Sequence, residues 1–382
     1  WGDALFINQA GLGGLAQGAL HAQPNLGPER TKEFETGVDL GLLNSHMDAS
    51  LTAYLDRTEG AIFGLPLAAS TGFSSITANA ATIRNRGLEA SVNYRPIMGQ
   101  NLTWEVGVNW SKNENRLVSL SGQQFADLNT GGGFTGAVPT AWYGAGVGVL
   151  RGNDFARCGR GLVLPGIGDV DAQCGNAPKG ALFIDSAGFP VLDPTQRVIS
   201  NGNPSWLGSV HTSVTYKKLT VSGLLDIRHG GQTWDGTRGA LYNFGAHADT
   251  KIRYQPVVIG KNWLPGPVAG PGAGETVDLN QHYFTGIGGG FGPVGSQFVE
   301  DASFVKLREI GVAYSLDQPF VRNWGFSSID VRLSARNLHT WTKYRGIDPE
   351  ANLAGASSLI QGVDYFNNPQ TRSFVLSLGL NR

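Results

Sequence analysis

The sequence of 382 residues is poor in charge, in cysteine and in long apolar runs. Charged residues make up 15% of it and the formal net charge is −1, so we expect no nucleic-acid partner. No apolar run approaches the ~20 residues that a membrane-spanning helix requires. A membrane role would therefore have to use strands, and the mean hydropathy of −0.12 fits a barrel whose inward side chains are polar.

Motifs of catalysis are missing as well. The sequence holds no H-E-x-x-H, G-x-S-x-G or P-loop pattern, and its seven histidines are scattered. The glycine-rich stretches 144–148 and 286–290 follow no buried strand and open no helix, which favours surface loops over phosphate-binding loops. Asp169 and Asp171 are too few carboxylates for a Ca²⁺ loop. We therefore predict no enzyme activity, no cofactor and no metal site.

The two cysteines, Cys158 and Cys174, lie in one glycine-rich segment. Two thiols with no further metal ligand nearby form a local disulfide more often than a metal site. The pattern predicts a disulfide between Cys158 and Cys174, with two free structural thiols as the alternative.

Alternation of apolar and polar residues is the most informative feature that is present. Between Leu102 and Trp110 every even position is large and apolar, and every odd position is polar or glycine. Successive side chains of a strand point to opposite faces, so this segment predicts a strand with one apolar and one polar face. We expect Val106 and its even neighbours to face lipid, and Thr103 and Glu105 to face an aqueous lumen.

The same pattern recurs along the whole chain. In one segment the apolar positions change phase between Leu307 and Ile310, which predicts a β-bulge near Arg308. Tight turns alternate with long segments, at about 118–204, 230–298 and 339–370, as in barrels with short periplasmic turns and long external loops. The nine predicted strands lie near residues 33–42, 50–56, 88–95, 102–111, 210–216, 219–227, 305–314, 329–336 and 373–380.

The predicted fold is all-β, an antiparallel transmembrane β-barrel. Bacterial single-chain barrels close with an even number of strands, and an unpaired strand edge is costly in lipid. An odd number of strands, together with a first residue Trp1 that is not Met, therefore predicts further strands upstream. We expect residues 1–382 to be one unit, the nine or ten C-terminal strands of a larger barrel.

Motifs at the strand boundaries resemble those of a known family. The order and placement of these motifs are similar to those of the TonB-dependent outer-membrane transporters, specifically the SusC/RagA-like nutrient importers. The motifs are PNLGPERTKEFE at 24–35, IRNRGLE at 83–89, GNPSW at 202–206, LDIRHGG at 225–231, DASFVKLRE at 301–309 and RNLHTWTKY at 336–344, ahead of DPE at 348–350.

The resemblance implies a barrel of about 22 strands, occluded by an N-terminal plug, in the outer membrane of a bacterial cell. It implies energy-coupled import of a nutrient such as an oligosaccharide or an oligopeptide. The plug, the segment that engages the TonB complex and the earlier strands would then lie upstream of Trp1. Outer-membrane lipid and a SusD-like surface lipoprotein are the further partners that the resemblance implies.

Two sets of residues are candidates for the functional site. Aromatic rings above a lumen can stack on sugars or hold peptide side chains, with a purely structural role as the alternative. Charged residues on the polar strand faces need partners, and the resemblance implies that plug residues are those partners. The aromatic candidates are Trp142, Tyr143, Trp234 and Trp263, and the plug-facing charges are Glu33, Glu35, Asp39, Arg332 and Arg336.

Two other classes of protein remain open at this point. A passive porin or a structural outer-membrane barrel would share the strand pattern but would have no plug and no TonB-binding segment. A secreted all-β binding protein would bury Trp104 and Trp110 in a core, and its solubility would not depend on detergent.

Overall fold

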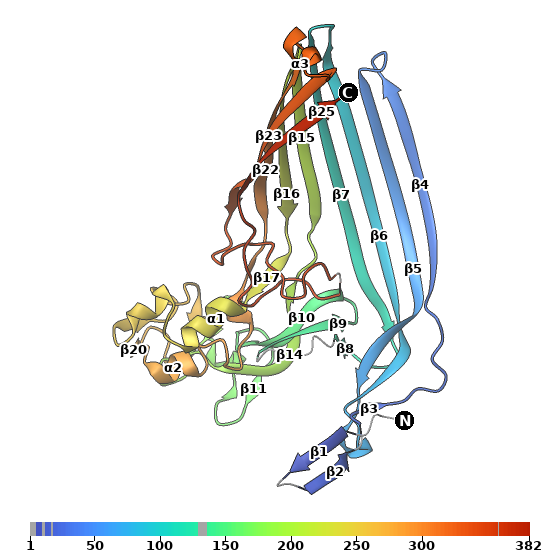
Figure 1. The fold of residues 1–382 in the computed structure, drawn as a ribbon. Coiled ribbons are helices and arrows are strands. Elements are labelled where there is room, and N and C mark those ends of the chain that lie inside the picture. The colour runs from blue at the N-terminus through green and yellow to red at the C-terminus, as the bar shows by residue number, and fades with distance from the viewer. Residues whose placement is uncertain (1–4, 10–11, 17, 129–135, 358) are drawn as a thin grey trace.

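The computed structural model describes residues 5–9, 12–16, 18–128, 136–357 and 359–382. Nine long strands form one curved antiparallel sheet in the order β25-β23-β22-β16-β15-β7-β6-β5-β4, and each contains one of the nine predicted segments (Figure 1). Their bounds are β4 (Arg30–Leu42), β5 (Met47–Pro66), β6 (Ser75–Met98), β7 (Leu102–Leu120), β15 (Trp206–Tyr216), β16 (Leu219–His229), β22 (Phe304–Leu316), β23 (Ser328–Thr342) and β25 (Ser373–Asn381).

The register of the sheet places apolar residues opposite apolar residues and polar residues opposite polar ones. Val108 of β7 lies opposite Val92 of β6 and Val210 of β15, and Val210 in turn lies opposite Leu225 of β16. One position further along β7, Asn109 begins a corresponding polar row. Because a strand has a period of two, matched rows of this kind give the whole sheet one apolar and one polar face.

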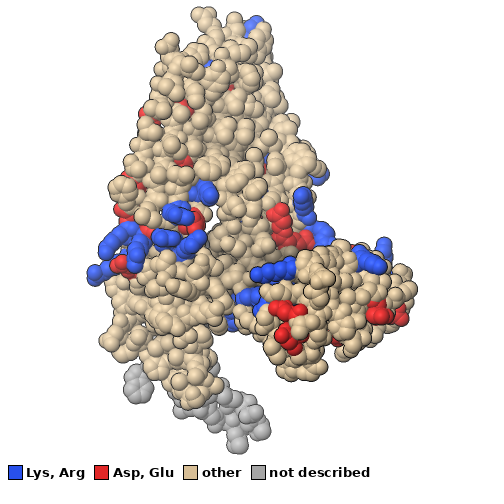
Figure 2. Space-filling view, turned by 180° about the vertical axis from the view of Figure 1, so that it is seen from behind, with Lys and Arg blue, Asp and Glu red and all other residues tan. Residues whose placement is uncertain are grey.

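The apolar face is open to its surroundings. Phe34 on β4 is 69% exposed and Leu376 on β25 is 65% exposed. Rows of exposed large apolar side chains are typical of a lipid-facing surface and not of a surface in water. On the face seen in Figure 2 the strands show few charged atoms, and Lys, Arg, Asp and Glu gather toward the loop end.

The predicted bulge in β22 is confirmed. Leu307 and Glu309 face consecutive residues of β16, Leu225 and Leu224, so Arg308 is the extra residue. The pairing of β22 with β23 shifts at the same place. The insertion shifts the alternation by one position, so Leu307 before it and Ile310 after it lie on the same apolar face, as the phase change in the sequence predicted.

The sheet is an open arc among the described residues. β4 has β5 as its one neighbour, and β25 has β23. Short turns and α3 (Pro319–Asn323) lie at one end, and the long segments lie at the other (Figure 1). No helix in the described part of the chain is long and apolar enough to cross a membrane.

The segment 118–204, predicted to be a long external loop without strands, is partly a sheet. It contains the four-stranded sheet β14-β10-β9-β8, built from β8 (Phe125–Asp127), β9 (Ala137–Trp142), β10 (Gly146–Phe155) and β14 (Leu192–Asn201). Most residues of β10 are buried, so the strand does not alternate between apolar and polar residues. Leu117 of β7 is fully buried against this sheet. This contact fixes the four-stranded sheet to the end of the strand wall.

A larger apolar core lies within the loops and includes Trp234, Phe284 and Phe298. The remaining elements are β1 (Leu5–Gln9), β2 (Leu12–Ala16), β3 (Leu20–His21), η1 (Ala69–Thr71), β11 (Val163–Leu164), β12 (Gly168–Asp169), η2 (Asp171–Gln173), β13 (Leu182–Phe183), β17 (Gln232–Asp235), α1 (Gly236–Asn243), η3 (Ala248–Ile252), β18 (Pro256–Val258), β19 (Val268–Ala269), β20 (Thr276–Asp278), α2 (Gln281–Thr285), η4 (Ser296–Phe298), β21 (Val299–Asp301) and β24 (Val363–Asp364).

Candidate functional site

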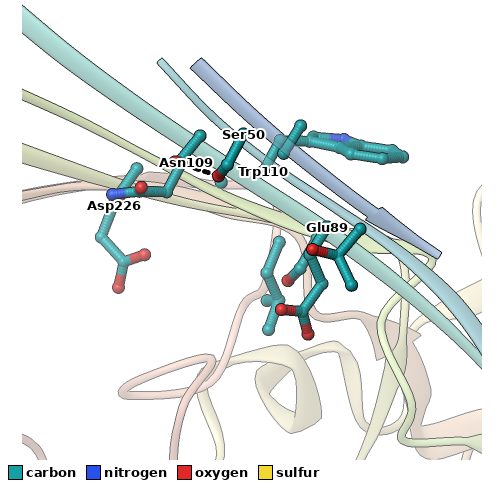
Figure 3. A pocket seen from close by; sticks show the side chains of 12 residues that line it. Ser50, Glu89, Asn109, Trp110 and Asp226 are labelled. Carbon is teal, nitrogen blue, oxygen red and sulfur yellow. Dashed lines mark hydrogen bonds between the residues drawn. The ribbon is translucent and has the colours of Figure 1, made fainter. Parts of the chain in front are cut away.

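The polar face of the sheet holds a hollow of about 460 Å³ that crosses β5, β6, β7, β15 and β16. Figure 3 shows Glu89 and Asp226 pointing toward the side of the loops, and Trp110 pointing to the opposite side of the sheet. The Ser50 and Ser91 hydroxyls lie 2.7 Å apart in this row of side chains. The hollow offers carboxylates, hydroxyls and the Asn109 amide, which can bind water, a polar substrate or another polar protein surface.

An ion cluster holds one loop against this polar face. Lys306 Nζ lies 2.7 Å from Asp348 Oδ1 and 2.5 Å from Glu350 Oε2. Arg308, the bulge residue, places Nη2 2.6 Å from Asp226 Oδ2 and 2.5 Å from Glu350 Oε1. The cluster therefore links β16 and β22 to the segment after β23. Burial raises the pKa of Asp348, but the hydrogen bond and charge of Lys306 and the backbone N–H groups of Glu350 and Gln370 together outweigh it, so the net pKa is lowered.

The predicted plug-facing charges divide into two groups. Arg332 Nη2 and Arg336 Nε donate to Glu309 at 2.8 and 3.0 Å, so both arginines already have a partner in the wall. Glu33, Glu35 and Asp39 project from the polar face of the edge strand β4. These three carboxylates form no hydrogen bond or ion pair with the residues that the structure describes.

Trp142 and Tyr143 lie together at the end of β9. The Trp142 ring stacks on Phe125 with centroids 5.5 Å apart, and the Arg151 guanidinium lies 4.5 Å from the centroid of the same Phe125 ring. Tyr143 is 56% exposed. Of the pair, Tyr143 presents the accessible ring.

Trp234 and Trp263 belong to the loop core. Trp234 is 2% exposed, so its ring is not accessible to a ligand in this structure. Trp263 packs against the same core and donates from Nε1 to the Tyr283 hydroxyl at 2.8 Å. A large aromatic side chain serves a core and a ligand site equally well, and sequence position alone did not separate the two. The four aromatic candidates therefore do not form one site.

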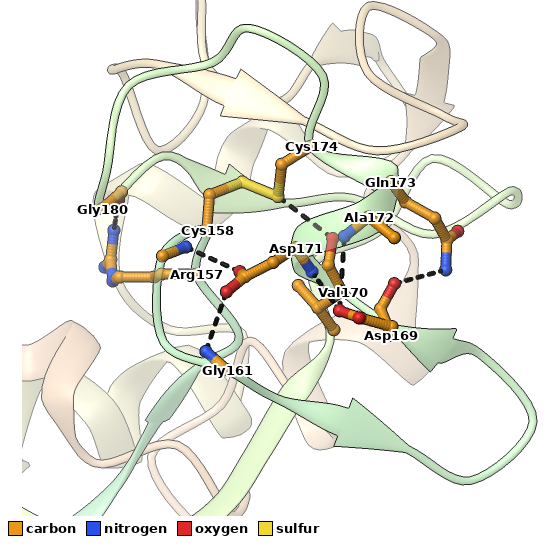
Figure 4. Close-up of a disulfide and its surroundings, with 11 residues drawn as sticks. Arg157, Cys158, Gly161, Asp169, Val170, Asp171, Ala172, Gln173, Cys174 and Gly180 are labelled. Carbon is orange, nitrogen blue, oxygen red and sulfur yellow. Dashed lines mark hydrogen bonds between the residues drawn. A yellow bond between two sulfur atoms is a disulfide. The ribbon is translucent and has the colours of Figure 1, made fainter.

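The predicted disulfide is present, with Cys158 and Cys174 Sγ atoms 2.07 Å apart (Figure 4). Asp171 supports the same loop, because its carboxylate accepts hydrogen bonds from the backbone N–H groups of Gly159 at 2.6 Å and Gly161 at 2.8 Å. These bonds hold the pKa of Asp171 below its usual value. The carboxylate considered for a Ca²⁺ loop thus caps backbone amides.

The loops contain a buried polar network that was not predicted from the sequence. The Tyr344 hydroxyl donates to Asp364 Oδ2 at 2.8 Å, and the Asp235 side chain accepts from the Arg238 N–H at 2.8 Å at the start of α1. Arg238 Nη1 also lies 2.6 Å from Glu300 Oε1. Burial raises the pKa of Asp235 to about 6. This network joins β17, β21 and β24, whose residues are up to about 130 positions apart. No local sequence motif predicts it.

The sheet has an apolar face of the lipid-facing kind and a polar inner face, with short turns at one end and folded loops at the other. These features define the wall of an outer-membrane β-barrel. A family model described as "TonB dependent receptor-like, beta-barrel" matches residues 3–338. The chain belongs to this family, and its place is the bacterial outer membrane.

Several known proteins are similar to this chain. "TonB-dependent receptor P3" of Formosa agariphila is 26% identical over 368 residues, covering 94% of this chain and 35% of that protein. "TonB-dependent receptor SusC" of Bacteroides thetaiotaomicron is 23% identical over 369 residues, covering 93% and 32%. The chain therefore spans about a third of the length of these relatives.

The fold also matches a solved structure. "Structure of the RagAB peptide transporter" superposes with a TM-score of 0.65 at 20% identity, and the match covers 99% of this chain and 38% of that one. The match confirms the predicted antiparallel barrel fold. The relatives are named as receptors or a transporter and not as enzymes, in agreement with the expected absence of catalysis.

Proposed function

We propose that this chain forms part of the barrel of an outer-membrane importer that takes up a nutrient in a TonB-dependent, energy-coupled way. The nutrient class is an oligosaccharide or an oligopeptide, and the peptide transport named for the RagAB structure supports the second. The observation that carries the proposal is the polar face of the wall, where the hollow with Glu89 and Asp226 lies beside loops held inward by Lys306 and Arg308. A polar path through lipid is what a hydrophilic nutrient requires.

Several partners belong to the proposal. Among the described residues no strand pairs with the outer edges of β4 and β25, so in this proposal further strands of the same polypeptide or a partner chain complete the barrel. A plug fills the lumen and is the binding partner of Glu33, Glu35 and Asp39. The TonB complex supplies energy, and a SusD-like surface lipoprotein covers the loop end. Among the four aromatic candidates, the exposed ring of Tyr143 is the substrate contact.

Uptake measurements in cells test the proposal. Cells that express the full-length gene are given fluorescent oligosaccharides or oligopeptides, with and without a protonophore that abolishes the energy supply to TonB. We expect uptake that stops with the protonophore and that is absent from a gene deletion. Uptake that continues unchanged without energy would identify a passive porin, and a protein that stays soluble without detergent would identify a secreted binding protein.

A further inference from the structure

A second hollow of about 460 Å³ lies within the loop region, between α1, η3 and α2. Its lining combines four aromatic rings with two cations and amide groups, and no carboxylate lines it among the described residues. One carboxylate, that of Asp249, lies behind the lining, where it accepts a hydrogen bond from the Tyr242 hydroxyl at 2.5 Å, and the two cations outnumber it. The hollow is therefore positively charged and aromatic.

The two cations are available to a ligand. Lys251 and Arg253 are both exposed, and neither forms an ion pair with any residue that the structure describes. Arg253 Nη1 donates to the backbone carbonyl of Gly245 at 3.2 Å, which fixes the guanidinium at the hollow and leaves its charge uncompensated. A fixed, uncompensated guanidinium is suited to bind a carboxylate or a sulfate.

Tyr254 is held in a conformation that costs free energy. Its backbone φ is +59°, in the left-handed region that favours glycine, and its ring is 69% exposed at the hollow. A side chain this exposed adds little to the core. Backbone strain of this kind occurs at ligand-binding sites, and here it falls on an aromatic residue that lines the hollow.

We propose that this hollow binds an anionic oligosaccharide whose sugar rings stack on Tyr254 and Phe244 and whose acidic groups bind Lys251 and Arg253. Phe244 is 65% exposed, so both rings are accessible from solvent. The side-chain amide of Gln281 lines the same hollow and can bind sugar hydroxyls. The acidic group is a carboxylate or a sulfate ester.

The lining favours a sugar over a peptide. An extended peptide that binds by strand addition takes its main-chain hydrogen bonds from the edge of a sheet. All residues of this lining lie on α1, η3, α2 or the connecting segments, and no strand contributes to it. This inference specifies the substrate class of the import proposed above. It rests on that proposal only for the transport of the ligand after binding.

Equilibrium binding to the purified protein in detergent tests the inference. The probes are tetragalacturonate, which carries carboxylates, a κ-carrageenan tetrasaccharide, which carries sulfate esters, neutral maltotetraose and the acidic peptide hexaglutamate. We expect at least one of the two anionic sugars to bind saturably, with an affinity that falls as NaCl is raised, and maltotetraose and hexaglutamate to bind more weakly. The anionic sugar that binds more tightly shows whether the hollow prefers a carboxylate or a sulfate ester.

Variants locate the binding. Lys251→Gln and Tyr254→Gly should each weaken binding by about tenfold, since each removes one direct contact. Tyr254→Gly should leave the thermal midpoint close to that of the wild type, because relief of backbone strain offsets the greater freedom of the unfolded chain. Lys261→Gln, an exposed lysine outside the hollow, and Phe366→Gly, another exposed aromatic residue with a positive φ of 54°, are the matched controls and should bind normally.

Four results would overturn the inference: binding by none of the probes, equal binding of maltotetraose, binding that both hollow variants leave unchanged, or preferential binding of hexaglutamate. The last would assign the hollow to an acidic peptide. The measurement needs no TonB complex and no energy. Intact binding in a protein that imports nothing would therefore count against the proposed import alone, and intact import with no binding would count against this hollow alone.

Discussion

Lys306 Nζ lies 2.7 Å from Asp348 Oδ1, which joins the start of β22 to a loop residue 42 positions further along the chain. The Lys306 side chain is 3% exposed, so this charge is buried and depends on its carboxylate partners. A buried ion pair contributes little net stability when intact, but loss of one partner is costly because the other charge stays buried. The contact therefore determines whether the loop stays on the polar face of the wall.

Replacing this cation should release the loop. Lys306→Met leaves Asp348 buried without its cation and should destabilise the loop by about 3 kcal/mol or more. Limited proteolysis should then show new cleavage within residues 345–372, whereas the exposed control Lys261→Met should be cut like the wild type. A protected loop in Lys306→Met would show that apolar contacts alone hold it.

The disulfide should stabilise its own loop. Closing a loop of about 15 residues removes unfolded-state entropy worth roughly 3 kcal/mol in the chain-entropy model. The double variant Cys158→Ser, Cys174→Ser should therefore be cut by protease between these positions faster than the wild type, while the barrel stays folded. Alkylation of the unreduced wild type should label neither cysteine. Labelling of both would contradict the pairing in solution.

A charge on the lipid face should destabilise the barrel. Val106 lies on the apolar face, opposite Tyr94 and Thr212, and Val106→Arg should cost about 2–4 kcal/mol if the position is near the bilayer midplane. Urea unfolding in lipid vesicles measures this loss. Asn109→Arg puts the same cation on the polar face near Asp226 and should be tolerated. Tolerance in the opposite order would reverse the assignment of the two faces.

The network at Asp235 should make the loops sensitive to pH. Burial raises the pKa of Asp235 from 3.8 to about 6, so the folded state binds this proton more tightly than the unfolded state. Its contribution to the free energy of unfolding is therefore largest below pH 4 and falls as the pH rises to 6, by roughly 3 kcal/mol in all.

Hydrogen exchange can detect this change. After correction for intrinsic pH dependence, the amides of α1 should be better protected at pH 5 than at pH 7. Asp235→Asn keeps an oxygen that accepts from the Arg238 N–H and has no charge to titrate, so the difference between the two pH values should shrink. An identical pH response in the two proteins would assign it to other groups.

The strand wall could be predicted because its physics is local. The period of two between Leu102 and Trp110 depends on adjacent residues alone, and the phase change at Arg308 located a bulge that the structure confirms. β6 runs from Ser75, well before the predicted start near Leu88, because its first residues pair with β5 and pack against the loops.

The loops could be predicted far less well. β10 is buried on both faces and carries no alternation, so it did not stand out from irregular sequence. Trp234 and Tyr143 look alike as loop aromatics, yet one is in the core and the other is exposed. The pairing of Lys306 with Asp348 depends on the folded path of the whole loop, which neighbouring residues do not encode.

A nitroxide scan along β7 tests the central claim, that this sheet is a membrane wall with lipid on one face and an aqueous lumen on the other. Single cysteines at residues 102–111 of a cysteine-free full-length protein in lipid vesicles would be spin-labelled, and their collision rates with oxygen and with a water-soluble nickel chelate measured. We predict that labels at Trp104, Val106 and Val108 favour oxygen and that labels at Thr103, Glu105 and Asn109 favour the chelate. A scan without this period of two, or with the two sets reversed, would contradict the account.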